Sequence, residues 1–243
     1  MISDNNERIY ISLGPWCHGA GNLRSCNLRK CSLPFDWSLT KDEFGMEYVN
    51  NLIETKFENY VNKLKRISRC NTISEYYPYT SFVHYDLIKD RVGSIGDIFD
   101  IDPSMRHTRP AFIGRRQSVI DIFIKRGKHF IDIINNIDNK CVFFYCINME
   151  TFIIKDKFEK IINDLYLFEN NIMPLNSKCK YEFICYIPFG GIDEYNNYDI
   201  SKLDLFGKNF KNIKFCKYYY NRGINKTYGN TDDFLKLLEN LTI

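Results

Sequence analysis

The sequence predicts an α/β fold with a mostly parallel sheet flanked by helices, in a single layered domain over residues 1–243. Residues 141–147 form a continuous apolar run, as expected of a strand that is buried on both faces of a sheet. Strand-like and helical patterns alternate through the rest of the chain, and helices are the usual connections between parallel strands. No internal repeat, coiled coil or low-complexity linker divides the chain.

In the N-terminal part, a short β-rich run predicts a first strand, and the glycine-containing segment after it predicts a helix. A longer helix follows, in which apolar residues recur at helical spacing; Thr40 is a suitable N-cap and Glu43 completes a capping box. The predicted elements are a strand at 9–13, a helix at 18–28, an irregular aromatic segment at 32–40, a helix from 41 to about 65, and strand-like pieces at 74–79 and 82–85 within a less regular stretch.

The C-terminal part alternates more regularly between helical and strand patterns. A long helical pattern opens it, with Gly127 as a candidate interruption. The closing helix has Asn230 or Thr231 as its cap. The predicted elements are helices at about 114–136, 155–168 and 231–241, strands at 141–147, 181–187 and 212–219, and a surface loop at 193–201.

Composition indicates a folded protein without nucleic acid as its main partner. Hydrophobic residues make up 44% of the chain, including 17 Tyr and 19 Phe, which is enough for a sizeable core. The net charge is +3, from 33 basic and 30 acidic residues, too balanced for a nucleic-acid-binding surface to dominate. Frequent Asn, Ile and Lys with little Ala fit an AT-rich genome and favour a viral or parasite source.

The cysteines and the N-terminus favour a cytoplasmic protein with reduced thiols. The nine cysteines form no Cys-x-x-Cys pair, and the polar N-terminus lacks the pattern of a signal peptide. No apolar stretch approaches the roughly 18 residues of a membrane span. We therefore expect no membrane association.

No metal site or cofactor is expected. Cys17, Cys26 and Cys31 do not have the spacing of a zinc ribbon or finger. Cys141 and Cys146 lie five positions apart on a predicted strand, so their side chains are expected on opposite faces.

Cys17 is the first candidate for chemistry. It follows a strand that ends in Gly14-Pro15, at the point where the predicted helix begins. Backbone N–H groups and the positive end of the helix dipole favour a thiolate there, the form that attacks carbonyl carbon. The structural alternative is that Cys17 is one small buried hydrophobic residue among nine cysteines.

A thiol nucleophile needs an imidazole partner and a group that orients the imidazole. His84 lies on a separate strand-like element after the cysteine, the arrangement that papain-type sites use. We expect His18 to point elsewhere on its helix and His129 to be a solvated helix residue. The alternative for His84 is a structural role with satisfied hydrogen bonds.

Asp36 lies between two large aromatic residues, after Pro34, which is unusual for a solvated loop. It could orient His84, cap a helix or accept a bond from a buried backbone amide. The capping or structural role is the more common outcome for such a residue.

A phosphate site is the alternative for the turn at Gly14. The strand-to-helix turn contains glycine, and basic residues occur both after it and near the long helix. However, it has neither the Gly-x-Gly-x-x-Gly pattern nor the P-loop lysine. This hypothesis gives a transferase or binding domain for a nucleotide or sugar phosphate; its candidate residues are Arg24, Arg29, Lys30, Arg115, Arg116, Lys125, Arg126 and Lys128.

Residues 12–37 resemble the opening motif of a family of papain-like cysteine peptidases (domain of unknown function 1796), with members in bacteria and large DNA viruses. The motif reads Ser-Leu-Gly-x-x-Cys, then an arginine-containing helix, then Pro-Phe-Asp-Trp. Further on, Phe82-x-His84, the basic helix leading into the strand at 142–145, and the aromatic-Gly-x-x-Asp pattern at 228–234 are similar to later family elements. The family commonly has Asp directly after this histidine, whereas Tyr85 stands there in this chain.

The resemblance implies a cysteine peptidase or other thiol hydrolase that acts on a protein or peptide substrate. It implies Cys17 as nucleophile, His84 as general base and Asp36 as the third group. A papain-like α+β fold is the alternative architecture. A host-interaction protein with an inactive site is a further functional alternative.

Overall fold

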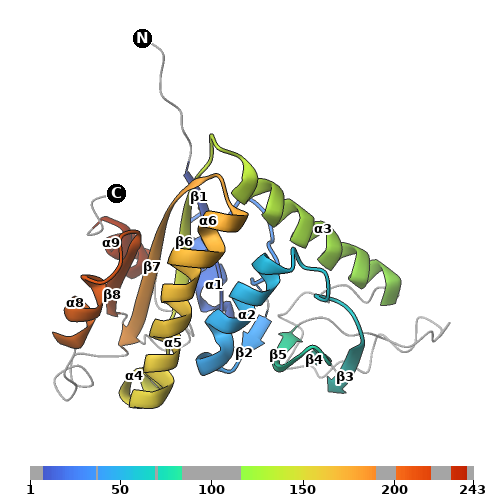
Figure 1. Cartoon of the computed structure of the whole chain (residues 1–243), viewed down its shortest axis with the longest axis horizontal. Coiled ribbons are helices and arrows are strands. Elements are labelled where there is room, and N and C mark those ends of the chain that lie inside the picture. Colours follow the sequence, from blue (N-terminus) through green and yellow to red (C-terminus); the bar gives the residue numbers. More distant parts are fainter. Residues whose placement is uncertain are drawn as a thin grey trace, which may run out of the picture.

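Four parallel strands form the larger of two sheets in the computed structural model, which describes residues 8–36, 38–68, 71–83, 116–189, 201–219 and 231–239. The strands are β1 (Arg8–Ser12), β6 (Lys140–Cys146), β7 (Lys180–Phe189) and β8 (Ile213–Tyr219), and they lie in that order across the sheet. All three pairings are parallel, so the carboxyl ends of the strands lie along one edge (Figure 1). The predicted α/β class with a parallel sheet is confirmed.

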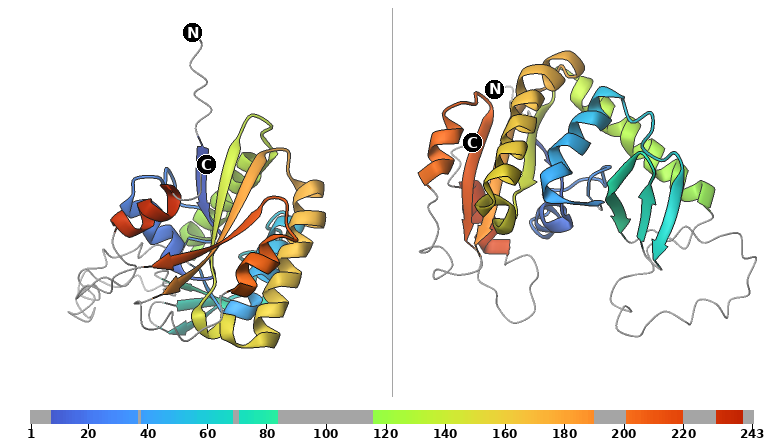
Figure 2. Two further views of the ribbon diagram at one scale, coloured as in Figure 1. Left: turned by 90° about the vertical axis from the view of Figure 1, so that its left-hand side faces the viewer. Right: turned by 60° about the horizontal axis from the view of Figure 1, so that its bottom comes forward.

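Helices cover both faces of this sheet. On one face lie α1 (Cys17–Ser25) and α9 (Thr231–Glu239), which share a core cluster with alternate residues of β6 and β7 (Figure 2, left). On the other face, α2 (Asp42–Glu54), α3 (Arg116–Asn135) and α5 (Lys155–Leu167) contribute to a larger cluster. Cys141 belongs to this larger cluster and Cys146 to the first, so the prediction that they lie on opposite faces is confirmed.

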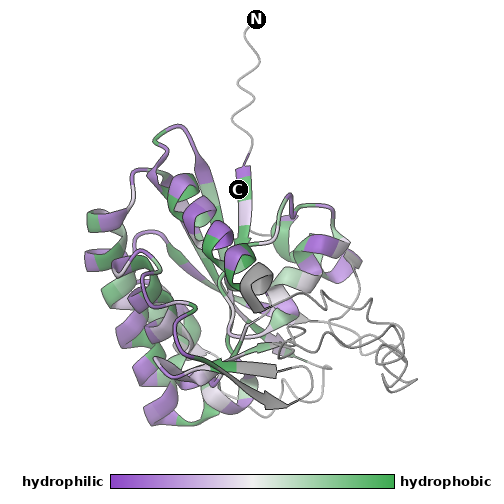
Figure 3. Ribbon diagram, turned by 90° about the vertical axis from the view of Figure 1, so that its right-hand side faces the viewer, coloured by the Kyte–Doolittle hydropathy of each residue, from purple (hydrophilic) through white to green (hydrophobic). Residues whose placement is uncertain are grey.

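The helix surfaces follow the amphipathic pattern that burial on a sheet requires. On α3, Phe123, Phe130 and Ile134 are buried, whereas Asp121 and Lys125 are exposed. Figure 3 shows hydrophobic residues on the inner sides of the helices and hydrophilic residues on their outer sides. None of the helices within the described ranges is long and apolar enough to cross a membrane.

A small antiparallel sheet is inserted between α1 and α3 in the chain (Figure 2, right). It contains β2 (Ser38–Thr40), β5 (Tyr77–Val83), β4 (Asn71–Ser74) and β3 (Leu64–Ser68), in that spatial order. Phe82 of this sheet packs against Phe123 of α3, with ring centroids 5.0 Å apart. The larger core cluster therefore includes residues from both sheets.

The remaining helices are short and follow strands β6 and β7. They are α4 (Met149–Ile153), the π-helical turn η3 (Phe168–Ile172) and α6 (Met173–Asn176), both continuous with α5, and α8 (Ser201–Gly207). The helix α5 runs from the carboxyl edge of the parallel sheet towards its amino edge (Figure 1).

The predicted helix over 41–65 is too long. The observed α2 ends at Glu54, and Lys56 and Phe57 adopt positive φ values of 49° and 65°, which an α-helix does not allow. The chain turns there and residues 64–68 form β3. The apolar side chain of Phe57 continues the helical pattern in sequence, but it is buried in the core from a turn.

The capping box at Thr40 and the interruption at Gly127 are also wrong. Thr40 ends β2, and its hydroxyl lies 3.0 Å from that of Thr80; Lys41 is the N-cap of α2 and makes no side-chain capping bond. Gly127 lies inside a continuous α3, where an added Cβ would be 3.0 Å from the Phe57 ring. Its role is therefore close packing.

Three boundaries differ in smaller ways. The irregular segment at 32–40 contains β2, and a turn at 75–76 divides the strand-like piece predicted at 74–79. Of the surface loop predicted at 193–201, residues 193–200 lie outside the described part, and Ser201 begins α8. Residues 84 and 85 of the second piece also lie outside it.

Candidate active site

Cys17 is the first residue of α1, at the carboxyl edge of the parallel sheet. The turn before it continues along β6: the Leu13 N–H donates to the Phe144 carbonyl at 2.9 Å, and the Cys146 N–H donates to the Gly14 carbonyl at 3.2 Å. Gly14 has a φ of 89°, in the left-handed region that favours glycine. Ligand sites in α/β sheets commonly lie at this edge, beyond the carboxyl ends of the strands.

Only two residues between positions 11 and 20 reach solvent, and they are neighbours. Trp16 is 39% exposed and Cys17 is half-buried, whereas the others in this stretch are buried. Trp16 and Cys17 are therefore the two residues through which this stretch meets solvent. A substrate that reaches Cys17 would also meet Trp16.

The amino end of α1 is suited to a developing negative charge. Trp16 is the N-cap and makes no side-chain hydrogen bond to the first turn. The N–H groups of a helix's first turn have no partner within the helix, and the dipole favours an anion there. This arrangement can stabilise a thiolate or an oxyanion next to Cys17.

His18 lies in the core behind Cys17, bound to two polar residues. Its Nδ1 is 2.9 Å from the Tyr186 hydroxyl and 3.2 Å from Nδ2 of Asn22. An amide nitrogen can only donate, so Nδ1 accepts and the ring proton is on Nε2. Burial lowers the pKa of His18 to about 4, so the ring is neutral near pH 7 and is a poor general base.

Tyr186 connects His18 to a second cysteine. Its hydroxyl lies 2.9 Å from His18 Nδ1 and is also hydrogen-bonded to the Cys146 thiol. Burial is the largest cause that raises the pKa of Tyr186 well above 10, and Cys146 raises it further. The hydroxyl therefore stays protonated. A negative charge on Cys17 also contributes to raising the pKa values of Tyr186 and Cys146, so the three groups lie within electrostatic reach of one another.

Trp16 is hydrogen-bonded to a buried carboxylate, that of Asp42. Trp16 Nε1 donates to its Oδ1, and Thr151 Oγ1 donates to its Oδ2 at 2.9 Å. The Tyr145 hydroxyl donates to the Asp42 carbonyl at 3.3 Å. Asp42 therefore joins the first turn of α2 to the turn that carries Cys17 and to α4.

Asp36 has structural partners. Its Oδ2 accepts from the Leu33 N–H at 2.8 Å and lies 3.3 Å from Nη1 of Arg29. Burial raises its pKa to about 6, although Arg29 and the Leu33 N–H act in the opposite direction. Of the three roles expected from the sequence, accepting from a buried backbone amide is confirmed. Orienting His84 stays a prediction.

His84, the candidate base, lies outside the described residues, and so does His107. The distance between Cys17 and His84 is therefore not part of the described geometry. His129 is exposed on α3, as predicted. Among the basic residues considered for phosphate binding, Arg29 and Arg126 lower the pKa of Asp36. Arg24 and Lys30 are exposed.

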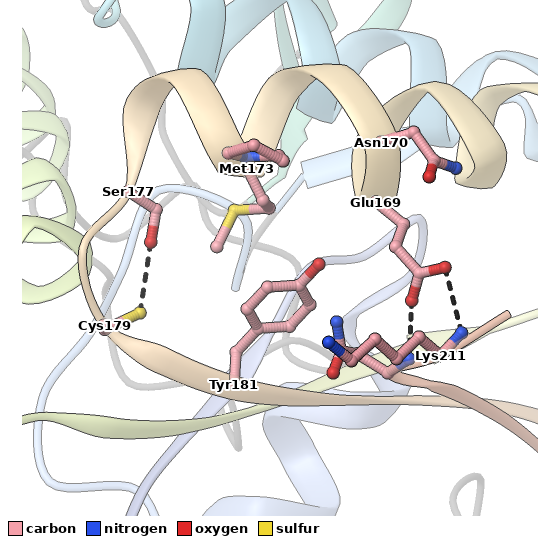
Figure 4. A pocket seen from close by; sticks show the side chains of 9 residues that line it. Glu169, Asn170, Met173, Ser177, Cys179, Tyr181 and Lys211 are labelled. Carbon is pink, nitrogen blue, oxygen red and sulfur yellow. Dashed lines mark hydrogen bonds between the residues drawn. The ribbon is translucent and has the colours of Figure 1, made fainter.

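A cavity of about 300 Å³ lies at the opposite, amino edge of the parallel sheet (Figure 4). On one side, the Glu169 carboxylate accepts from the backbone N–H groups of Lys211 at 3.0 Å and Asn212 at 2.5 Å, which attaches η3 to the start of β8. On the other side, Cys179 lies 3.3 Å from the Ser177 hydroxyl. A hydrogen bond with Cys141 lowers the pKa of Cys179 to about 7.

The described part of the chain holds no group of three His, Cys, Asp or Glu side chains that could bind a metal ion. None of its cysteines forms a disulfide.

The profile of one protein family, described as "Putative papain-like cysteine peptidase (DUF1796)", matches residues 8–168, about two thirds of the chain. The chain belongs to this family. No curated protein and no solved structure matches it. The stretch shared with the papain-like cysteine peptidase family holds Cys17, Asp36 and His84, and it ends before β7 and β8.

Sequence reasoning missed most of the neighbours of Cys17. Asp42 has a cue in the acidic start of α2, but the same pattern also predicts a capping box at Thr40. Tyr186 and Thr151 have none, because each is far along the chain from the residue it contacts, His18 and Asp42 respectively. Their proximity depends on the order of the strands.

Proposed function

We propose that the protein is a thiol hydrolase, and specifically a peptidase, with Cys17 as nucleophile, His84 as general base and Asp36 as the third group. The observation that carries this proposal is the position of Cys17: solvent-accessible, first in α1, at the carboxyl edge of a parallel sheet. Membership of the papain-like cysteine peptidase family supports the same chemistry. The substrate is then a protein or peptide.

The small sheet supports the choice of His84 as partner, because its strand β5 ends at Val83, the residue before His84 in the chain. Ser38 of β2 pairs with Phe82 of β5, and the strands are antiparallel. The Thr40 N–H of β2 donates to the Pro15 carbonyl at 2.9 Å, which ties this sheet to the turn that carries Cys17.

In the proposed reaction, His84 takes the thiol proton as the Cys17 sulfur attacks the substrate carbonyl carbon. The N–H groups at the start of α1 stabilise the oxyanion. His84 then gives the proton to the leaving amine, and the C–N bond breaks to leave a thioester on Cys17. His84 next activates water, which attacks the thioester, releases the carboxylic acid and restores the thiol.

The test is the rate at which each cysteine reacts with iodoacetamide near neutral pH, measured by peptide mass spectrometry. Cys17 is expected to react faster than Cys31, which is also half-buried and whose pKa burial raises. Cys179 is not a suitable reference because its pKa is lowered to about 7. Substitution of His84→Ala is expected to slow labelling of Cys17. If Cys17 reacts no faster than Cys31, it is not the nucleophile.

One observation favours a second function, binding of a nucleotide or sugar phosphate. Gly14 has a positive φ just before a helix N-terminus at the carboxyl edge of the sheet, where phosphates commonly bind. Thermal stabilisation by nucleotide sugars that persists in a Cys17→Ala variant would support it. An inactive host-interaction protein, the third hypothesis, predicts neither labelling nor stabilisation.

A further inference from the structure

The indole of Trp16 is fixed at the surface beside Cys17. Trp16 is 39% exposed, but its Nε1 donates to Asp42, which is 6% exposed. The polar edge of the ring therefore points inward while part of the residue stays accessible to solvent. An exposed tryptophan without such a bond could occupy several rotamers.

Asp42 is itself fixed by hydrogen bonds. Each of its carboxylate oxygens accepts a bond, Oδ1 from Trp16 and Oδ2 from Thr151 at 2.9 Å. Burying a carboxylate is unfavourable unless such bonds compensate. Burial raises the pKa of Asp42, and the bonds from Trp16 and Thr151 act in the opposite direction. An unfavourable buried carboxylate thus serves to hold a surface ring in place.

A rigid, partly exposed aromatic ring is typical of a recognition contact. Little conformational entropy remains to be lost when a ligand binds to it, so its apolar area contributes efficiently to affinity. Because both oxygens of Asp42 are already engaged and buried, the carboxylate offers no atom to a cationic ligand. The exposed ring favours an apolar group.

We propose that Trp16 is a specificity-determining residue that contacts an apolar, preferably aromatic, side chain of the peptide substrate next to the reacting carbonyl, and that Asp42 is the residue that positions it. This inference rests on the proposed function, because it places the substrate at Cys17. It adds the class of side chain that the site selects.

The test compares alkylating probes that differ in the group they carry. The probes are iodoacetamide, its N-benzyl derivative and a derivative with a trimethylammonioethyl group; each rate at Cys17 is divided by the rate with glutathione. The corrected benzyl rate is expected to exceed the corrected iodoacetamide rate by about two- to tenfold, the range of an aromatic pair contact. This ratio is insensitive to the intrinsic reactivity of the thiol.

Variants assign the preference to Trp16 and Asp42. Trp16→Ala is expected to abolish the benzyl preference, and Asp42→Leu to reduce it. Asp42→Asn should give a preference between those of the wild type and Asp42→Leu, because the amide oxygen still accepts from the indole. Tyr166→Ala is the matched control, since Tyr166 is an aromatic residue that is 57% exposed near the end of α5, at the opposite edge of the sheet. Far-UV circular dichroism shows which variants fold. If Asp42→Leu does not fold, Trp16→Phe takes its place, because it removes the same hydrogen bond and keeps an aromatic ring.

A second readout follows the ring itself. The chain has two tryptophans, so Trp16 is the only one in a Trp37→Phe background. The fluorescence anisotropy of Trp16 is expected to fall in Asp42→Leu, because the ring gains mobility, and to stay unchanged in Tyr166→Ala.

Failure of this inference is distinct from failure of the proposed function. If Cys17 outpaces Cys31 but shows no benzyl preference, or keeps that preference in Trp16→Ala, Trp16 does not select substrate and the nucleophile role stands. If the cationic probe gains more than the benzyl probe, the apolar assignment is wrong. If Cys17 outpaces Cys31 with none of the probes, the proposed function falls and this inference falls with it.

Discussion

The Tyr186 hydroxyl lies 2.9 Å from Nδ1 of His18, the residue that follows Cys17. This bond fastens the first turn of α1 to β7, the third strand across the parallel sheet. A contact between residues 168 positions apart in the chain thus anchors the helical turn that carries the candidate nucleophile.

Removing this hydroxyl is expected to destabilise the protein. In Tyr186→Phe, the Cys146 thiol loses its hydrogen bond with Tyr186, and His18 keeps only Asn22 at Nδ1. We expect the free energy of unfolding to fall by about 1–2 kcal/mol in urea titrations. Tyr166→Phe, at an exposed position, is the control and should change it by less than about 0.5 kcal/mol. Equal stability of the two variants would mean that the Tyr186 bonds contribute nothing.

His18 is expected to make the protein less stable in mild acid. Its folded pKa of about 4 is below the ordinary 6.5, so the neutral form is favoured by folding. The stability it contributes is complete above pH 6.5 and is lost as the pH falls towards 4, by about 2–3 kcal/mol between pH 7 and 4.5. His18→Asn, which keeps an acceptor but does not titrate, should lose that much less over the same interval. An imidazole NMR signal of His18 that titrates near 6.5 would contradict this.

Asp36 is expected to make the protein less stable as the pH rises, the opposite of the effect of His18. Its folded pKa of about 6 is above the ordinary 3.8, so folding favours the protonated form. Stability from this group is complete below pH 3.8 and is lost as the pH rises through 6, by up to about 3 kcal/mol. Unfolding of Asp36→Asn and of the wild type should therefore be compared at pH 4 and 7.5: the variant should gain about 2–3 kcal/mol relative to the wild type. A gain for the wild type would show that the Arg29 ion pair outweighs burial.

Gly45 in α2 is expected to tolerate no side chain. An added Cβ would overlap the Tyr145 hydroxyl and lie 3.0 Å from Cβ of Pro15, in the turn that carries Cys17. Alanine favours a helix over glycine by about 1 kcal/mol, but overpacking costs about 1–3 kcal/mol, so Gly45→Ala should lower the melting temperature. Gly207→Ala is the control, because its nearest neighbour, Cδ2 of Phe215, is 3.8 Å away. A melting temperature for Gly45→Ala at or above that of the wild type would be incompatible with this packing.

Much of the fold could be predicted from periodicity. The buried run at 141–147 and the helical patterns around it identify a parallel sheet, because they depend on local burial alone. The prediction of one helix over 41–65 is wrong because Phe57 repeats the helical spacing, whereas its backbone has a positive φ. Local spacing does not distinguish a buried residue in a helix from one in a turn.

The candidate site was predictable only in part. Cys17 at a helix start follows from Gly-Pro and the residues around it, which are neighbours in sequence. The contacts of Trp16 with Asp42 and of His18 with Tyr186 join distant segments. They require the order β1-β6-β7-β8, and no local pattern encodes that order.

The position of β7 sets a limit on how this protein can be shortened. β6 pairs with β1 on one side and with β7 on the other, yet the stretch shared with the family ends at Phe168, before β7 begins. A fragment cut there would leave the buried strand β6 with a bare edge and would lack Tyr186. The homology boundary is thus not a folding boundary, and a fragment that keeps β6 paired on both sides should extend at least to Phe189.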